Sequence, residues 1–165
     1  MNKIILLLIL TSWSVKAQIN SKIEGITINS PCELEYTRNL GNQNNYTCPY
    51  QYGNGKLDNF SVTVTNLQTE MVGMTGNSLN VYKKTFLETI KSNSESNGET
   101  ARNMEFSNGI KAVSSISYLT YADQKFKNIA IAFLYKQKSF IVNLTTNNLT
   151  RNNEIEELID KIIFK

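Results

Sequence analysis

The sequence predicts an α+β domain in which an antiparallel sheet of about five to seven strands packs against two helices. Three patterns support this fold class. Between residues 111 and 146, β-branched and aromatic residues come in three short runs separated by polar turns, which is typical of an antiparallel meander. Apolar residues recur at three- and four-residue steps in 79–90 and again in 152–164, which predicts two amphipathic helices.

The first 17 residues have the pattern of a secretory signal peptide. A basic start at Lys3 precedes an apolar run over 4–10 and a small-residue end at Ala17, so Gln18 is the predicted mature start. The apolar run is much shorter than the roughly 20 residues that cross a bilayer. We therefore expect an exported protein, periplasmic or secreted, with residues 18–165 forming one domain and no membrane-spanning segment.

Charge and composition exclude several classes of function. Removing Lys3 and Lys16 with the signal leaves 15 basic against 14 acidic residues, a balance that does not favour nucleic acid or an anionic membrane as partner. The chain has no histidine, which excludes Ser-His-Asp and Cys-His nucleophilic sites and histidine-ligated zinc. Nucleotide-binding glycine motifs are also absent. The sequence thus predicts a protein without cofactor, metal or enzymatic activity.

A pair of carboxylates is the remaining route to catalysis. Glu33 and Glu35 share one face of an extended segment, and Glu88 or Glu105 can meet Asp123. Glycosidases need two carboxylates at a fixed separation. With 14 acidic residues in the chain, however, some pairs arise by accident. A carboxylate-based hydrolase is therefore the least favoured function.

The two cysteines, Cys32 and Cys48, are predicted to form a disulfide. An exported protein with only two cysteines generally pairs them, whereas redox pairs usually occur as Cys-x-x-Cys. Two cysteines without histidine are too few ligands for zinc. Before them, isoleucines among polar residues in 19–30 predict one strand.

Several tyrosines surround the second cysteine. Tyr46, Tyr50 and Tyr52 can grip a protein partner or stack on a sugar ring, because tyrosine combines a large apolar face with a polar tip. Alternatively, they belong to a hairpin that turns at 53–55, and their rings cover the disulfide and the sheet edge.

A second candidate surface lies in the loop 70–76. Met71 and Met74 can line a lid or a binding lip, because methionine adapts to varied apolar surfaces. The alternative is a plain connection between strand and helix. Together with the three tyrosines, these methionines form the candidate partner surface.

The remaining elements follow from local periodicity. Alternating apolar residues predict a strand over 59–65, and Asn77 or Ser78 is a suitable cap for the first helix. The small polar segment 91–100 predicts an exposed loop, and a strand follows over 101–106. The last helix, 152–164, has glutamates near its start and lysines near its end, which suits the helix dipole.

This order of elements resembles the Mog1/PsbP-like α/β sandwich, a family of small, often exported domains. The resemblance rests on FSVTVTNL leading into SLNVYKKTFLETIKS, on KAVSSISY and NIAIAFLYKQKSFIVNLTT, and on the closing EIEELIDKIIFK. It covers residues 58–165 and implies an accessory or binding protein, since the family has no invariant catalytic motif.

Two functions remain open. The first is a non-enzymatic accessory or interaction module that binds a protein partner through the tyrosines or the methionine loop. The second is a carrier of a small apolar ligand held between the sheet and the helix that carries Phe86. An interaction module predicts surface aromatics and a dry core, whereas a carrier predicts a cavity.

Overall fold

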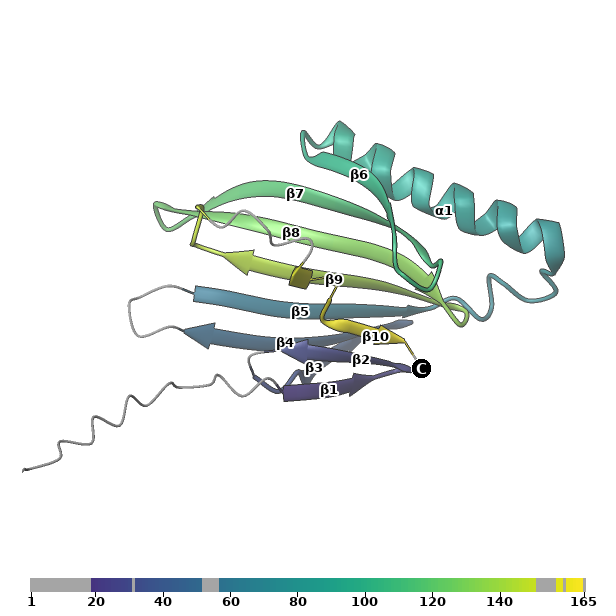
Figure 1. Ribbon diagram of the computed structural model, residues 1–165, viewed down its shortest axis with the longest axis horizontal. Coiled ribbons are helices and arrows are strands. Elements are labelled where there is room, and N and C mark those ends of the chain that lie inside the picture. The colour runs from purple at the N-terminus through teal and green to yellow at the C-terminus, as the bar shows by residue number, and fades with distance from the viewer. Residues whose placement is uncertain (1–18, 31, 52–56, 151–156, 159, 165) are drawn as a thin grey trace, which may run out of the picture.

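The computed structural model describes residues 19–30, 32–51, 57–150, 157–158 and 160–164. Within these ranges the chain forms a seven-stranded antiparallel sheet, a three-stranded antiparallel sheet and one long helix (Figure 1). The strands are β1 (Ile19–Ile23), β2 (Ile26–Ser30), β3 (Glu35–Leu40), β4 (Gln43–Gln51), β5 (Leu57–Asn66), β6 (Thr100–Glu105), β7 (Lys111–Tyr121), β8 (Gln124–Tyr135), β9 (Lys138–Thr146) and β10 (Ile162–Phe164), and the helix is α1 (Gly76–Ser96).

The predicted meander is confirmed and forms one half of the large sheet. Its strands β7, β8 and β9 are neighbours in the order β3-β4-β5-β9-β8-β7-β6, and the small sheet has the order β1-β2-β10. The predicted strands at 59–65 and 101–106 correspond to β5 and β6. The α+β class is therefore confirmed; within the described residues there is one long helix where two helices were predicted, and a second sheet in addition.

The helix α1 differs from its predicted bounds at both ends. It begins at Gly76, and the Oγ of Ser78 accepts a hydrogen bond from the Thr75 backbone N–H at 3.1 Å. It continues to Ser96 through much of the segment that was expected to be a loop, with the exposed ion pair Lys91–Glu95 on its last turns. Gly98, with φ +77°, then turns the chain towards β6.

Two-residue turns set the register of three hairpins. Both turn residues have positive φ at Glu24-Gly25, at Ala122-Asp123 and at Lys136-Gln137, as type I′ turns require. The first of these turns divides 19–30 into β1 and β2, where a single strand was predicted. Only Gly25 marks such a turn in the sequence, since the other two turns contain no glycine.

The predicted closing helix over 152–164 is corrected at its end, because 162–164 form the strand β10. Of the rest of this segment, 152–156 and 159 lie outside the described residues, and 157 and 158 are helical. That strand pairs antiparallel with β2, with Ile162 opposite Ile28 and Phe164 opposite Ile26. A short apolar run of β-branched and aromatic residues fits a helical and an extended pattern equally well. Pairing with β2 decides in favour of the strand.

The main core lies between the two sheets. Alternate residues of β5, β8 and β9 point towards the small sheet, where they meet buried isoleucines of β1 and β2. Phe133 and Phe140 stack in its centre with ring centroids 5.2 Å apart, and Phe164 meets Phe133 edge-on at 5.3 Å. The largest fully buried side chains are Phe60, Phe133, Phe140, Ile26, Ile28, Ile129, Ile131, Leu158, Val62, Val64, Val113 and Val142.

The opposite face of the large sheet carries α1 over β6, β7 and β8. Leu79, Tyr82 and Phe86 pack there on a small cluster of Leu67, Met71 and Leu134. The part of this face beyond the helix, on β4, β5, β9 and the first half of β8, is mostly polar, and all its positions except Ser139 are half-exposed or exposed. We call it the neutral face; its positions are Gln43, Asn45, Thr47, Pro49, Leu57, Asn59, Ser61, Thr63, Thr65, Ser139, Ile141, Asn143, Thr145, Gln124, Phe126, Asn128 and Ala130.

The Cys32–Cys48 disulfide is confirmed, and it ties the start of β3 to β4 across 16 positions of sequence. Replacing both cysteines by serine removes this constraint from the unfolded chain. We expect a loss of about 3 kcal/mol in the free energy of unfolding for a loop of this length. Urea unfolding of the oxidised protein, the reduced protein and the double variant measures it; an unchanged midpoint would contradict this expectation.

The assignment of 162–164 to a strand also has a direct test. Phe164→Ala removes a ring that meets Phe106, Phe133 and Tyr135 at 4.9 to 5.3 Å, and we expect a loss of about 2–3 kcal/mol. Ile163→Ala is the matched control, because Ile163 is 46% exposed and a strand turns it outward. Chemical unfolding should leave the control within about 0.5 kcal/mol of the parent. Equal losses in the two variants would argue against the strand.

Candidate functional site

A groove with a volume of about 990 Å³ separates α1 from the adjacent end of the large sheet. One wall is the middle of the helix, residues 80–88, and the other is the end of β6, the turn that follows it and the start of β7. The lining residues are Asn80, Lys83, Lys84, Leu87, Glu88, Asn103, Met104, Glu105, Gly109, Ile110, Lys111, Ala112 and Leu134.

The groove exists because the helix rests on a narrow contact. Tyr82 and Phe86 stack at 6.4 Å and bring the helix against the small cluster that includes Leu134. Leu87 belongs to the same predicted apolar stripe, yet it faces the groove. No residue of α1 is buried, although the helix has 21 residues. Because the apolar stripe of α1 is wider than this contact, part of its apolar surface lies at the groove.

The lining combines an apolar floor with charged rims. Leu87 and Leu134 contribute apolar groups, while lysines and glutamates come from both walls. On the helix, Lys84 and Glu88 form an ion pair at 3.7 Å, but both side chains are more than 60% exposed, so the pair adds little to stability. These charges remain available to a ligand. The groove therefore suits a molecule with apolar and polar groups in turn, such as a segment of protein.

The methionines of the candidate partner surface do not form an open lip. Met71 is 4% exposed and lies in the small cluster beneath α1, while Met74 is half-buried. The loop 70–76 is therefore a connection from β5 to α1, and Met71 helps to seat the helix. The expectation that Met71 contacts a partner is corrected, because a buried side chain offers no surface in this conformation.

The tyrosines have different surroundings. Tyr46 is half-buried in β4, its hydroxyl donates a hydrogen bond to Glu24 Oε1 at 3.1 Å, and Tyr36 meets its ring edge-on at 5.7 Å. Tyr46 thus holds β4 to the turn between β1 and β2. The backbone of Tyr50 belongs to β4, but its side chain and the whole of Tyr52 lie outside the described residues.

Glu24 is the centre of a polar cluster that joins both sheets. Its carboxylate accepts hydrogen bonds from Lys138 Nζ at 2.6 Å and from Asn44 Nδ2 at 2.6 Å, besides the Tyr46 hydroxyl. Burial by itself raises the pKa of Glu24, but these hydrogen bonds and the Lys138 charge lower the pKa below its ordinary value of 4.5. Burial and the Glu24 charge raise the pKa of Tyr46 to about 12.

The carboxylates considered for catalysis are dispersed, with one exception. Glu33 and Glu35 are exposed at the start of β3, and Asp123 lies in the turn at the far end of β7 from the groove. Glu88 and Glu105 both line the groove. Among the residues placed by the structure, no group of three acidic, cysteine or histidine side chains is arranged to hold a metal ion.

The groove was not predicted from the sequence. Asn103, Ile110 and Lys111 come from β6, β7 and the turn between them, and nothing in their spacing relates them to the helix. One available signal was the adjacent pair Phe86 and Leu87, which widens the apolar stripe beyond a single contact. The predicted ligand space beneath Phe86 is filled by the cluster on which that ring packs.

Two observations bear on the compartment. No helix in the described ranges has the length and apolar character needed to cross a membrane. The disulfide is compatible with an exported protein, since such bonds persist in oxidising compartments. The predicted signal peptide, 1–17, lies outside the described residues.

Comparison with known proteins identifies the fold alone. No family model and no curated protein matches the chain. Among solved structures, the chain is similar to a protein of Bacteroides thetaiotaomicron VPI-5482 determined at 1.50 Å, with a TM-score of 0.53 and 11% sequence identity. The match covers 86% of this chain and 45% of that protein, so the chain spans less than half of its length. At this identity the likeness supports the α+β architecture, and membership in the Mog1/PsbP-like family stays a prediction.

The Glu24 cluster makes stability depend on pH. Because the folded pKa of Glu24 lies below 4.5, its carboxylate stabilises the fold above that pH, and this contribution is lost as the pH falls through the folded pKa. We expect Glu24→Gln to lower the free energy of unfolding by about 1–3 kcal/mol at pH 7, since it leaves Lys138 unpaired. The difference from the parent should shrink below pH 4.

Urea unfolding at pH 7, 5, 4 and 3 measures both effects. Glu88→Gln is the control, because it breaks the exposed pair with Lys84 and should change stability by less than about 0.5 kcal/mol. A loss in Glu24→Gln that stays constant over the whole pH range would show that the carboxylate charge is not responsible.

Proposed function

We propose that the protein is an exported accessory protein without enzymatic activity, periplasmic or secreted, that binds an extended segment of a protein partner in the groove between α1 and β6. The main support for this proposal is the groove, which has an apolar floor and charged rims and is open to solvent. Extended segments present apolar and polar side chains in alternation, and they fit such a lining better than a uniformly apolar molecule does.

The position of β6 supports strand-like binding. In the described part of the large sheet, β6 pairs with β7 alone and forms one edge. The unpaired backbone N–H and C=O groups on the outer side of an edge strand can form hydrogen bonds with an added strand. Pockets for alternate side chains of the added strand then give specificity. A segment in the groove lies beside Asn103, Met104 and Glu105, which are the last three residues of β6.

A carrier of a small apolar ligand is the competing function. It needs an enclosed and mainly apolar pocket. The groove is open and has lysines and glutamates on both walls, and the space under Phe86 is occupied by Leu67, Met71 and Leu134. Both observations favour the protein segment. Export rests on the residues 1–17 pattern and is compatible with the disulfide.

The test is selection of binding peptides from a random display library against the oxidised protein, followed by affinity measurement. We expect selected peptides to lose at least about tenfold in affinity for Leu87→Lys, because the new charge occupies the apolar floor. Val81→Lys is the matched control: Val81 is 54% exposed on the same helix and does not line the groove. It should bind as the parent does.

Hydrogen exchange of the complex gives a second readout. If a segment adds to β6, the backbone amides on its outer side become protected when the peptide binds. Peptides that bind Leu87→Lys as well as the parent would contradict the proposal. A discrete small molecule that stays with the purified protein in native mass spectrometry, and that Leu87→Lys releases, would instead favour the carrier.

A further inference from the structure

The neutral face carries no charged residue at any of its positions on β4, β5, β8 and β9. Charged residues make up 19% of the chain, so about three charges are expected over this many positions, and protein surfaces usually carry more. Hydroxyl and carboxamide side chains occupy most of the positions instead. The surface is thus polar and wet but electrically neutral.

Hydrogen bonds between neighbouring strands orient the amides of this face. Thr63 Oγ1 donates to Asn45 Oδ1 at 2.8 Å, and Thr145 Oγ1 donates to Asn128 Oδ1 at 2.9 Å. In each pair the carbonyl oxygen of the asparagine is turned to the threonine, so the Nδ2 group points away from it. The same arrangement thus occurs on β4-β5 and on β8-β9, and in both pairs the Nδ2 group is a donor that the threonine does not use.

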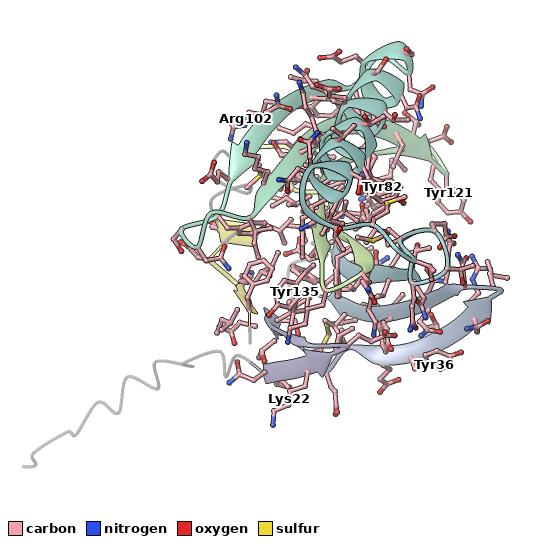
Figure 2. The ribbon with its side chains drawn as sticks, turned by 90° about the vertical axis from the view of Figure 1, so that its right-hand side faces the viewer. Lys22, Tyr36, Tyr82, Arg102, Tyr121 and Tyr135 are labelled. Carbon is pink, nitrogen blue, oxygen red and sulfur yellow. A yellow bond between two sulfur atoms is a disulfide. The ribbon has the colours of Figure 1, made fainter. Side chains whose placement is uncertain are left out.

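Two aromatic side chains continue the neutral face at one end, Tyr121 exposed and Phe126 half-buried. The β7-β8 hairpin extends beyond β9, and its helix side carries Tyr121, 74% exposed, and Phe126, which is opposite Leu119. Figure 2 shows Tyr121 on the same side of the sheet as Tyr82 of the helix. From Tyr121 at the end of β7 to Phe126 and Asn128 on β8, aromatic and amide side chains therefore lie on one side of the hairpin.

We propose that the neutral face, with Tyr121 and Phe126 at its end, binds a neutral polysaccharide chain lying along β8. Sugar hydroxyls donate and accept hydrogen bonds as the asparagine and threonine side chains do, and the apolar face of a pyranose stacks on an aromatic ring. The adjacent strand β3 carries Glu35 and Arg38 opposite Thr47 and Asn45, one charge of each sign, so this edge does not select a polyanion. A protein partner is disfavoured, because interfaces are depleted in serine and centre on buried apolar anchors.

The experiment is NMR titration of the oxidised protein, because asparagine side-chain amides give separate signals. The probes are the neutral hexasaccharides cellohexaose, maltohexaose and chitohexaose, with hexagalacturonate as a length-matched acidic control. We expect at least one neutral probe to shift the side-chain amides of Asn45, Asn128 and Asn143 with a Kd of about 0.01–1 mM. Binding should be insensitive to salt between about 0.05 and 0.5 M, since no ion pair is involved.

Two exposed tyrosines of β7 make a matched pair of variants. Tyr121→Ser should weaken binding by about tenfold through loss of the stacking ring, whereas Tyr118→Ser should leave it unchanged. Tyr118 is 67% exposed on the same strand but on its opposite side, so both changes cost little stability. Overall folding of each variant is checked by the dispersion of its backbone amide signals.

Four results would overturn the proposal. They are the absence of shifts with all three neutral probes at about 10 mM, binding of the acidic probe alone, and equal weakening in Tyr118→Ser and Tyr121→Ser. The fourth is a shift of the same amides with protein concentration in the absence of sugar, since the face would then be an interface between copies of this chain. The groove and its partner segment are tested separately by Leu87→Lys.

Discussion

Burial of one face of the seven-stranded sheet against the small sheet is the interaction on which the rest of the molecule depends. The rings of Phe133, Phe140 and Phe164 meet there, and the isoleucines of β1 and β2 close the core around them. Because side chains alternate along a strand, placing every second residue of β5, β8 and β9 in this core sends the others to the opposite face. The register of the hairpins therefore determines which residues are available for function.

The opposite face is divided between two surfaces with different physical properties. Over β6, β7 and β8 it supports α1 through the small contact of Tyr82 and Phe86 with the Leu134 cluster, and the groove lies beside this contact. The second surface lies over β4, β5 and β9. Its backbone is held in place by the core on the other side of the sheet, and hydrogen-bonded pairs such as Thr63–Asn45 orient its side chains. The first surface has an exposed helix as one wall, whereas the second lies on paired strands throughout.

Periodicity was sufficient to predict the elements whose partners are near in sequence. The meander and α1 follow from alternation and from the three- and four-residue repeat, and the disulfide follows from the cysteine count. What periodicity cannot supply is the choice of a distant partner. Residues 162–164 are extended because β2 offers them an edge, and Tyr46 is turned inward because Glu24 lies beside it. The groove depends on the position of α1, which no local pattern contains.

The same reasoning explains why the exposed tyrosines of β7 were not singled out from the sequence. The tyrosines near Cys48 are conspicuous because they are close in sequence, yet Tyr46 is committed to the contact between the sheets. Tyr118 and Tyr121 are inconspicuous in an alternating strand, where one of every two residues is expected to be buried. Tyr118 is level with the last paired residue of β9, and Tyr121 lies beyond the end of that strand. Exposure of Tyr121 thus accompanies strand length, since β8 is longer than its neighbour β9 and carries the end of β7 past it.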